Sequence, residues 1–96
     1  YNNLSITNLV SSIGVVGTDV TGVGTGRNLL AGCEYGGDKG IFGYGDTSPA
    51  KQNLTNLVSN TGVVSTDVTG VGTARNALAA CSYGGDKGIF AYGTVP

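Results

Sequence analysis

The sequence contains no histidine, no methionine and no tryptophan, and these absences narrow what the chain can do. Ser-His-Asp triads, Cys-His dyads and most zinc or iron sites are excluded without His, because imidazole is the usual base or ligand in them. Catalysis would have to depend on carboxylates, Lys, Tyr or Cys. Because no Met is present, we expect either a processed product or a segment of a longer repeat array.

Charge and long apolar runs are also scarce. Five Lys or Arg and six Asp or Glu give a net charge of -1, and the basic residues form no run. Nucleic acids and anionic membranes require a positive patch, so neither is expected as a partner. No apolar stretch approaches the ~20 residues of a membrane span, and no signal-like segment opens the chain. We therefore expect a soluble chain, of unknown compartment.

What the sequence does contain is an internal repeat. Residues 8–45 align with residues 56–93 at a spacing of 48, and 30 of these 38 pairs are identical. Periods of about 20–50 residues are typical of solenoids, propellers and arrays, whose units bury their apolar faces against their neighbours. The sequence predicts two repeats, 1–48 and 49–96, within one structural unit.

Each repeat is predicted to form four short antiparallel strands. In the second copy, runs rich in β-branched and aromatic residues cover 54–58, 63–68, 76–83 and 87–92, with glycine-rich or polar breakers between them. The segment "YGGDKGIF" predicts a hairpin, since Gly-Gly-Asp tolerates positive φ. The segment "ARNALAAC" holds good helix formers, but it is too short for a stable helix and must supply a strand of that hairpin. The predicted fold class is all-β.

The strand that precedes the hairpin has small or apolar residues on both of its faces. Leu29, Ala31, Cys33 and Tyr35 alternate with Asn28, Leu30, Gly32 and Glu34. This pattern is typical of a strand covered by sheets on both sides. Cys33 and Cys81 occupy equivalent positions, and sheets packed ~10 Å apart would hold them too far apart for a disulfide. We therefore expect two buried free thiols.

The runs "TGRNLLAGCEYGGDKGIFGYG" and "TARNALAACSYGGDKGIFAYG" resemble a kelch-type repeat, in which an arginine precedes a small-residue strand, a tight hairpin and a strand ending in glycine. Arg27 and Arg75 match the arginine, and Gly45 and Gly93 match the glycine. The double glycine and the later Trp of kelch repeats are missing here. The runs are also similar, more weakly, to regulator-of-chromosome-condensation repeats. Both resemblances imply β-propeller blades of four antiparallel strands.

Two blades cannot close a propeller, which usually has about four to eight. Alone, they would expose large apolar sheet faces. We therefore expect homo-oligomerisation into a ring, with a trimer of six blades as first choice and a tetramer of eight as second. The kelch-like register implies that the chain begins with two outer strands of one blade and ends with two inner strands of another. Neighbouring chains would then complete each other's blades.

Most conspicuous polar residues recur at the period, whereas an enzyme site needs an asymmetric set of roles. We therefore expect a non-enzymatic binding module without a cofactor or metal. Ion pairs are predicted between Asp19 and Arg27 and between Asp67 and Arg75, across the "VTGVGTG" turn. A glycan or a protein surface is the expected ligand. The candidate ligand-binding residues are Asp46, Thr47, Ser48 and Lys51 of the connector, and Asp38, Lys39, Asp86 and Lys87 of the hairpins.

The glycine-rich loop does not indicate a phosphate site or a calcium site. "TGVGTG" lacks the strand and helix context of a phosphate loop, and one carboxylate per loop is too few for calcium. Two glycosylation sequons occur, at Asn3 and at Asn53. Two alternatives stay open: a segment excised or engineered from a larger propeller, with no independent function, and part of a kelch-type oxidase, which bound copper would reveal.

Overall fold

The computed structural model describes residues 2–95, and every strand in this range is antiparallel. One sheet has the strand order β1-β2-β3 and the other is the pair β4-β5. No helix occurs within the described range, so the all-β prediction is confirmed. The strands are β1 (Ala31–Tyr35), β2 (Lys39–Gly43), β3 (Thr55–Val58), β4 (Ala79–Tyr83) and β5 (Lys87–Ala91).

The repeated segment "YGGDKGIF" forms a hairpin in both copies, as predicted. Tyr35 pairs with Lys39 across a three-residue turn, and Tyr83 pairs with Lys87 in the same way. The first two residues of each turn are glycines with positive φ, between 64° and 81°. A side chain would strain this left-handed backbone, so the paired glycines allow the chain to reverse over such a short distance.

The larger sheet crosses the boundary between the two repeats. β3, from the second repeat, pairs with β2, from the first, in a register that runs from Gly43↔Thr55 to Gly40↔Val58. The β-bridges Thr55↔Val68 and Val58↔Val64 add a fourth segment beside β3. We call these four segments, residues 31–35, 39–43, 55–58 and 64–68, the middle sheet. Each repeat contributes half of it.

Each end of the chain forms a hairpin that is equivalent to one half of the middle sheet. Residues 7–20 form the N-terminal hairpin, held by the β-bridges Thr7↔Val20 and Val10↔Val16. Its residues are equivalent to 55–68 of the middle sheet at the spacing of 48. The pair β4-β5 forms the C-terminal hairpin, which is equivalent to β1-β2. The chain therefore folds into one four-segment sheet and two separate halves.

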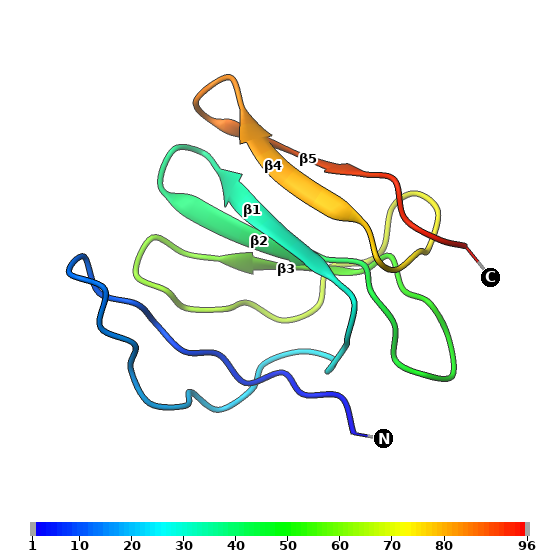
Figure 1. Cartoon of the computed structure of the whole chain (residues 1–96), viewed down its shortest axis with the longest axis horizontal. Helices are drawn as coiled ribbons and strands as arrows, with labels where there is room; N and C mark the ends of the chain where they lie inside the picture. The colour runs from blue at the N-terminus through cyan, green and yellow to red at the C-terminus, as the bar shows by residue number, and fades with distance from the viewer. Residues whose placement is uncertain (1, 96) are drawn as a thin grey trace.

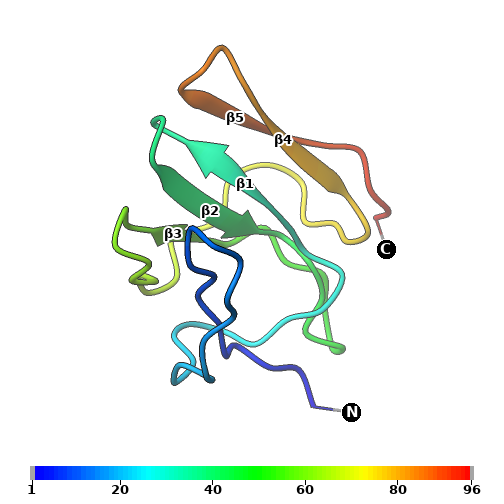
Figure 2. The ribbon, with the colours of Figure 1, turned by 60° about the vertical axis from the view of Figure 1, so that its left-hand side comes forward.

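The three parts lie in succession, with the middle sheet between the two hairpins (Figure 1). The view in Figure 2 gives the same order. Glycines on both layers allow a short distance between the middle sheet and the C-terminal hairpin. A β-carbon at Gly43 would lie 2.9 Å from Cζ of Phe90, and one at Gly88 would lie 2.9 Å from Sγ of Cys33. Because larger residues would clash, these small residues allow the C-terminal hairpin to pack closely.

The strands are shorter than predicted. The expected strand 76–83 is regular only over β4, and the expected strand 87–92 ends with β5. The interruptions coincide with Ala77 (φ 54°) and Tyr92 (φ 68°), whose left-handed backbone leaves the extended conformation. The expected strand 63–68 is reduced to the bridges at Val64 and Val68.

The described part of the chain has no buried hydrophobic side chain. The buried side chains are polar: Asn56 is 2% exposed, Asn76 8% and Arg27 9%. Large apolar side chains are open to solvent, and the exposure of Tyr92 reaches 87%. The expectation that two repeats alone leave apolar faces exposed is thus confirmed.

The two cysteines differ in how far a neighbouring layer covers them. Both thiols are free, as predicted. Cys33 is half-buried because the C-terminal hairpin covers its face of β1, but Cys81 is exposed. The prediction that both thiols are buried is therefore wrong, because Cys33 is covered only in part and Cys81 is not covered. The reason is that no sheet covers the equivalent face of β4 within residues 2–95.

Candidate functional site

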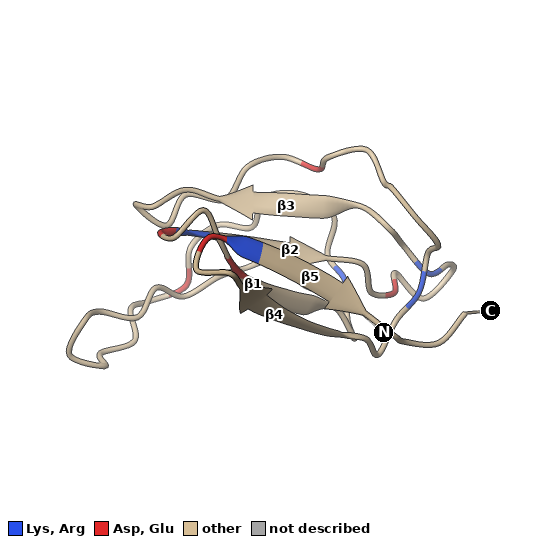
Figure 3. Ribbon diagram, turned by 90° about the horizontal axis from the view of Figure 1, so that it is seen from above, with Lys and Arg blue, Asp and Glu red and all other residues tan. Residues whose placement is uncertain are grey.

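The hairpin turns lie together at one end of the layers, and the long green connector lies at the other (Figure 1). We call the turns 11–14, 36–38, 59–62 and 84–86 the tip edge. Charged segments lie toward both of these ends, and an acidic segment also lies between them, on the loop beside β3 (Figure 3). Of the predicted ligand-binding residues, Asp38, Lys39, Asp86 and Lys87 belong to the tip edge or adjoin it. The other four belong to the connector.

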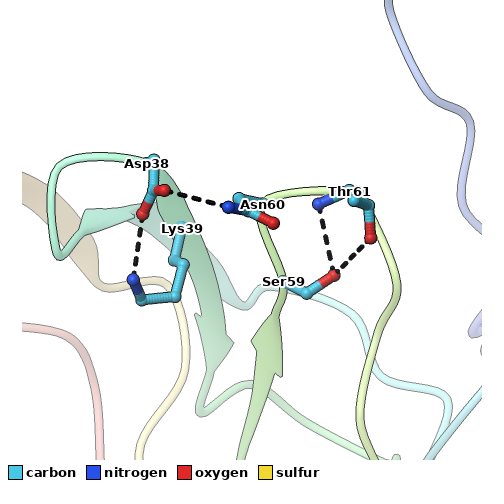
Figure 4. Close-up of polar contacts among 5 residues, drawn as sticks. All are labelled: Asp38, Lys39, Ser59, Asn60 and Thr61. Atoms are coloured by element: carbon cyan, nitrogen blue, oxygen red, sulfur yellow. Dashed lines mark hydrogen bonds and ion pairs between the residues drawn. The ribbon is translucent and has the colours of Figure 1, made fainter.

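Two turns of the middle sheet are joined by a side-chain hydrogen bond at the tip edge (Figure 4). Asn60 Nδ2 donates to Asp38 Oδ2 at 3.1 Å, and Lys39 Nζ lies 2.9 Å from Asp38 Oδ1. In the neighbouring turn, Ser59 Oγ accepts from the amide of Thr61 at 3.3 Å. The hydrogen bonds from Lys39 and Asn60 lower the pKa of Asp38. Asp38 is therefore an exposed, oriented carboxylate at neutral pH.

The C-terminal turn repeats this arrangement beside the first. Lys87 Nζ lies 2.7 Å from Asp86 Oδ1, and the carbonyl of Asp86 accepts from the amide of Gly36 at 2.5 Å. Each lysine also lies about 6 Å from a tyrosine ring, 5.8 Å for Lys87 over Tyr83. The tip edge thus presents carboxylates, ammonium groups and tyrosines at repeated positions. These groups suit a ligand rich in hydroxyls.

The connector residues are mainly occupied in holding the connector itself. Asp46 Oδ1 accepts from the amide of Ser48 at 2.7 Å, and Asp46 Oδ2 accepts from Asn76 Nδ2 at 3.0 Å. Thr47 Oγ1 donates to the carbonyl of Ala50 at 3.0 Å. Asp46 also forms a β-bridge with Lys51. Asp46 and Thr47 are also half-buried, whereas Asp38 and Asp86 are exposed, so the tip edge is more accessible to a ligand than Asp46 and Thr47 are.

The most enclosed polar cluster surrounds Arg27. Its guanidinium donates to the carbonyls of Thr25 (3.1 Å), Tyr44 (3.2 Å) and Leu54 (3.0 Å), and to Oδ1 of Asn56. Four hydrogen bonds compensate much of the cost of burying this cation. Burial still lowers the pKa of Arg27, against the opposing effect of Asp67.

Asn56 connects this arginine to a carboxylate. Its Nδ2 donates to the carbonyl of Ser65 at 3.2 Å and to Asp67 Oδ1 at 2.9 Å. Asp67 also accepts from the amide of Thr25 at 3.1 Å and from its hydroxyl at 2.6 Å. The hydrogen bonds from Thr25 and then Asn56 lower the pKa of Asp67. We call Thr25, Arg27, Asn56 and Asp67 the arginine joint, because it links the two repeats.

The joint differs from the ion pairs that the sequence predicted within each repeat. The pairing of β3 with β2 brings the second repeat to Arg27, so this arginine is connected to Asp67 and not to Asp19. Asp19 accepts from Asn8 instead, at 3.0 Å, and Arg75 donates to the carbonyl of Thr73 at 3.3 Å. The predicted pairs included neither Asn8 nor Asn56. Their identity in the two repeats was the available signal.

An open cleft of about 420 Å³ lies between the middle sheet and the segments that flank the N-terminal hairpin, at residues 4–7 and 23–27. Arg27 and Asn56 of the joint lie at its wall. No group of three or more His, Cys, Asp or Glu that could hold a metal occurs within residues 2–95. Over the same range, no helix qualifies as a membrane span. The apolar side chains that line the cleft include Leu4, Ile6, Val23, Leu30, Phe42 and Val64.

Both sequon asparagines use their side chains inside the fold. Asn53 Nδ2 donates to the carbonyl of Gly72 at 2.7 Å, and Asn3 Nδ2 donates to that of Asp46 at 3.4 Å. A glycan on Asn53 would have to displace the shorter of these contacts. The structure therefore assigns Asn53 a role in holding the segment around Gly72.

Comparisons with protein-family models, curated proteins and solved structures find no match to this chain.

Proposed function

We propose that the chain is a non-enzymatic structural and binding module. In this proposal its repeats are kelch-like propeller blades, and copies of the chain assemble into a closed ring of six or eight blades. The rim of this ring presents repeated sites for a ligand. The observation that carries the proposal is the absence of any buried hydrophobic side chain in residues 2–95.

Exposed apolar surface of this extent favours association. Soluble monomers rarely expose large contiguous apolar patches. Here Leu9, Val10, Val15 and Val16 of the N-terminal hairpin are each at least 50% exposed, and so is Tyr92 after β5. Covering these side chains with further layers of the same kind would supply the core that the chain lacks.

The arrangement of the strands supports blades shared between chains. The middle sheet has four segments, the number expected for one blade. The N-terminal hairpin is equivalent to its last two segments, and the C-terminal hairpin to its first two. The C-terminal hairpin of one chain and the N-terminal hairpin of the next would together make another such sheet.

A glycan is the ligand we favour for the tip edge. Asp38 and Asp86 offer exposed acceptors, Lys39 and Lys87 offer donors, and Tyr83, which is 51% exposed, offers a ring on which a sugar can pack. A ring would present several copies of this weak site and gain affinity through multivalency.

Native mass spectrometry and light scattering on the 96-residue chain test the assembly. A single species of three or four chains over a range of concentrations is the expected result. A chain that stays monomeric at every concentration would refute the proposed ring.

Glycan-array binding tests the ligand. We expect the wild-type chain to bind a subset of glycans. The binding signal of the double variant Asp38→Ala/Asp86→Ala should be lower by a factor of at least about ten. Ser12→Ala, on the same edge but outside the Asp-Lys turns, serves as the matched control. An unchanged signal for the double variant would exclude the proposed role of these turns.

A further inference from the structure

The arginine joint in the middle of the chain is complete, and its residues come from both repeats. Arg27 belongs to the first repeat, whereas Asn56 and Asp67 belong to the second. At the spacing of 48, Arg27 is equivalent to Arg75, and the two acceptor residues are equivalent to Asn8 and Asp19. The chain therefore carries one further donor half and one further acceptor half of the same joint.

The acceptor half is already formed in the N-terminal hairpin. Asn8 Nδ2 donates to the carbonyl of Gly17 at 3.1 Å and to Asp19 Oδ1 at 3.0 Å. The equivalent bonds of Asn56 measure 3.2 and 2.9 Å. Asn8 thus has the orientation that Asn56 adopts when it accepts from an arginine. Both Asn8 and Asp19 are exposed, and neither contacts an arginine of the described chain.

The donor half is Arg75, and it is incompletely bonded. Nη1 donates to the carbonyl of Thr73 at 3.3 Å, and the guanidinium lies 4.4 Å from the centre of the Tyr44 ring. Its Nε is buried and has no hydrogen-bond partner within residues 2–95. Arg27, in contrast, makes four hydrogen bonds. Two of those four bonds, from Nη1 to the carbonyl of Leu54 and from Nη2 to Asn56, reach the second repeat. A partner chain would supply the equivalent acceptors to Arg75, which lacks both bonds within residues 2–95.

The open strand edges are complementary in the same register. β2 pairs with β3 from Gly40↔Val58 to Gly43↔Thr55. The equivalent residues are 88–91 on β5 and 7–10 on the N-terminal hairpin. Neither of these two edges has its counterpart among the described residues, 2–95. An unpaired edge is a template for another strand, and here each edge has the sequence of the other's natural partner.

An aromatic contact between layers is likewise made in the middle of the chain and left open at its C-terminal end. Tyr44 packs against Phe90 with ring centres 5.1 Å apart, and its hydroxyl donates to the carbonyl of Val71 at 3.0 Å. Tyr92 is equivalent to Tyr44 but is 87% exposed. Phe42, equivalent to Phe90, is 40% exposed. A second copy would bring its own Phe42 to Tyr92.

We propose that a second copy of this chain docks head to tail, so that Arg75 of one copy enters the Asn8 and Asp19 site of the next and β5 pairs with residues 7–10. The interface is heterologous, because the two copies use different surfaces. Thr73, equivalent to Thr25, donates to Asp19 in this arrangement. The inference rests on the proposed self-assembly and identifies the contacts that drive it.

A complementation experiment tests this interface. Arg75→Ala removes the donor half and keeps the acceptor half, whereas Asp19→Ala does the reverse. Each variant alone should require a concentration at least ~30-fold higher to assemble, because truncating one partner of an enclosed charged pair weakens binding strongly. Mixed together, the two variants share one native joint and should form a 1:1 complex that grows no further. Ser12→Ala, on the same hairpin as Asp19, should assemble like the wild-type chain.

The outcomes separate the inference from the proposed function. If the wild-type chain assembles and Arg75→Ala assembles equally well, or if the mixture forms no 1:1 complex, the joint does not drive assembly and the inference is wrong. If the wild-type chain is always monomeric, the proposed ring fails as well.

Hydrogen exchange on the wild-type chain gives a second test that needs no variant. Raising the protein concentration should protect the amides of residues 88–91 and 7–10 together. Assembly that leaves these amides unprotected would overturn the proposed register.

Discussion

The contribution of the arginine joint can be measured by removing its central asparagine. Asn56→Ala deletes the acceptor for Arg27 and two donated bonds, to the carbonyl of Ser65 and to Asp67. A hydrogen bond to a charged group contributes about 1.5–3 kcal/mol, and a neutral one about 1 kcal/mol. Because Asn56 is only 2% exposed, water cannot easily replace these partners. We expect the free energy of unfolding to fall by about 3–5 kcal/mol.

The repeat supplies a matched control for this variant. Asn8→Ala makes the same chemical change at the equivalent position, where both bonds are exposed and no arginine is bound in the part of the chain that the structure describes. It should cost about 1 kcal/mol or less in the monomer. Urea unfolding followed by circular dichroism measures both, at a concentration low enough to avoid assembly. Equal losses in the two variants would refute the view that the joint stabilises the middle sheet.

Three further predictions follow. The folded-state pKa of Asp67 lies below its usual value of 3.8, so its contribution to stability is complete above that value and is lost as the pH falls through the lower folded pKa; Asp67→Asn should reduce this acid sensitivity in urea unfolding. Gly88→Ala should destabilise the monomer by about 1–3 kcal/mol, whereas Gly40→Ala, whose β-carbon would meet nothing closer than 3.6 Å, should not. Cys81 should react with a thiol reagent faster than Cys33 in the monomer, and assembly should protect it; equal rates in the monomer would contradict the layer order.

The local structure of this chain follows from its sequence alone. Paired glycines at 36–37 and 84–85 readily adopt the positive φ of a tight turn, and the strand-forming runs on either side favour strands, so both hairpins were predictable. The spacing of 48 also established which residues are equivalent, and with them the expectation of exposed apolar faces. The hairpins depend on residues that are close in the sequence, and the equivalent positions follow from the repeat spacing. Neither requires knowledge of how distant segments pack.

The contacts across the repeat boundary, in contrast, depend on how distant strands align. Arg27 and Asp67 are 40 positions apart, and their connection through Asn56 exists because β3 aligns beside β2 in one particular register. A residue's own repeat cannot reveal this, so the predicted pairing of Arg27 with Asp19 did not identify its partner. Burial was decided in the same way: Cys33 and Cys81 have equivalent positions, but only Cys33 has a layer packed over it. Two cysteines at equivalent positions of similar strands differ here because burial is a property of the neighbouring layer and not of the strand.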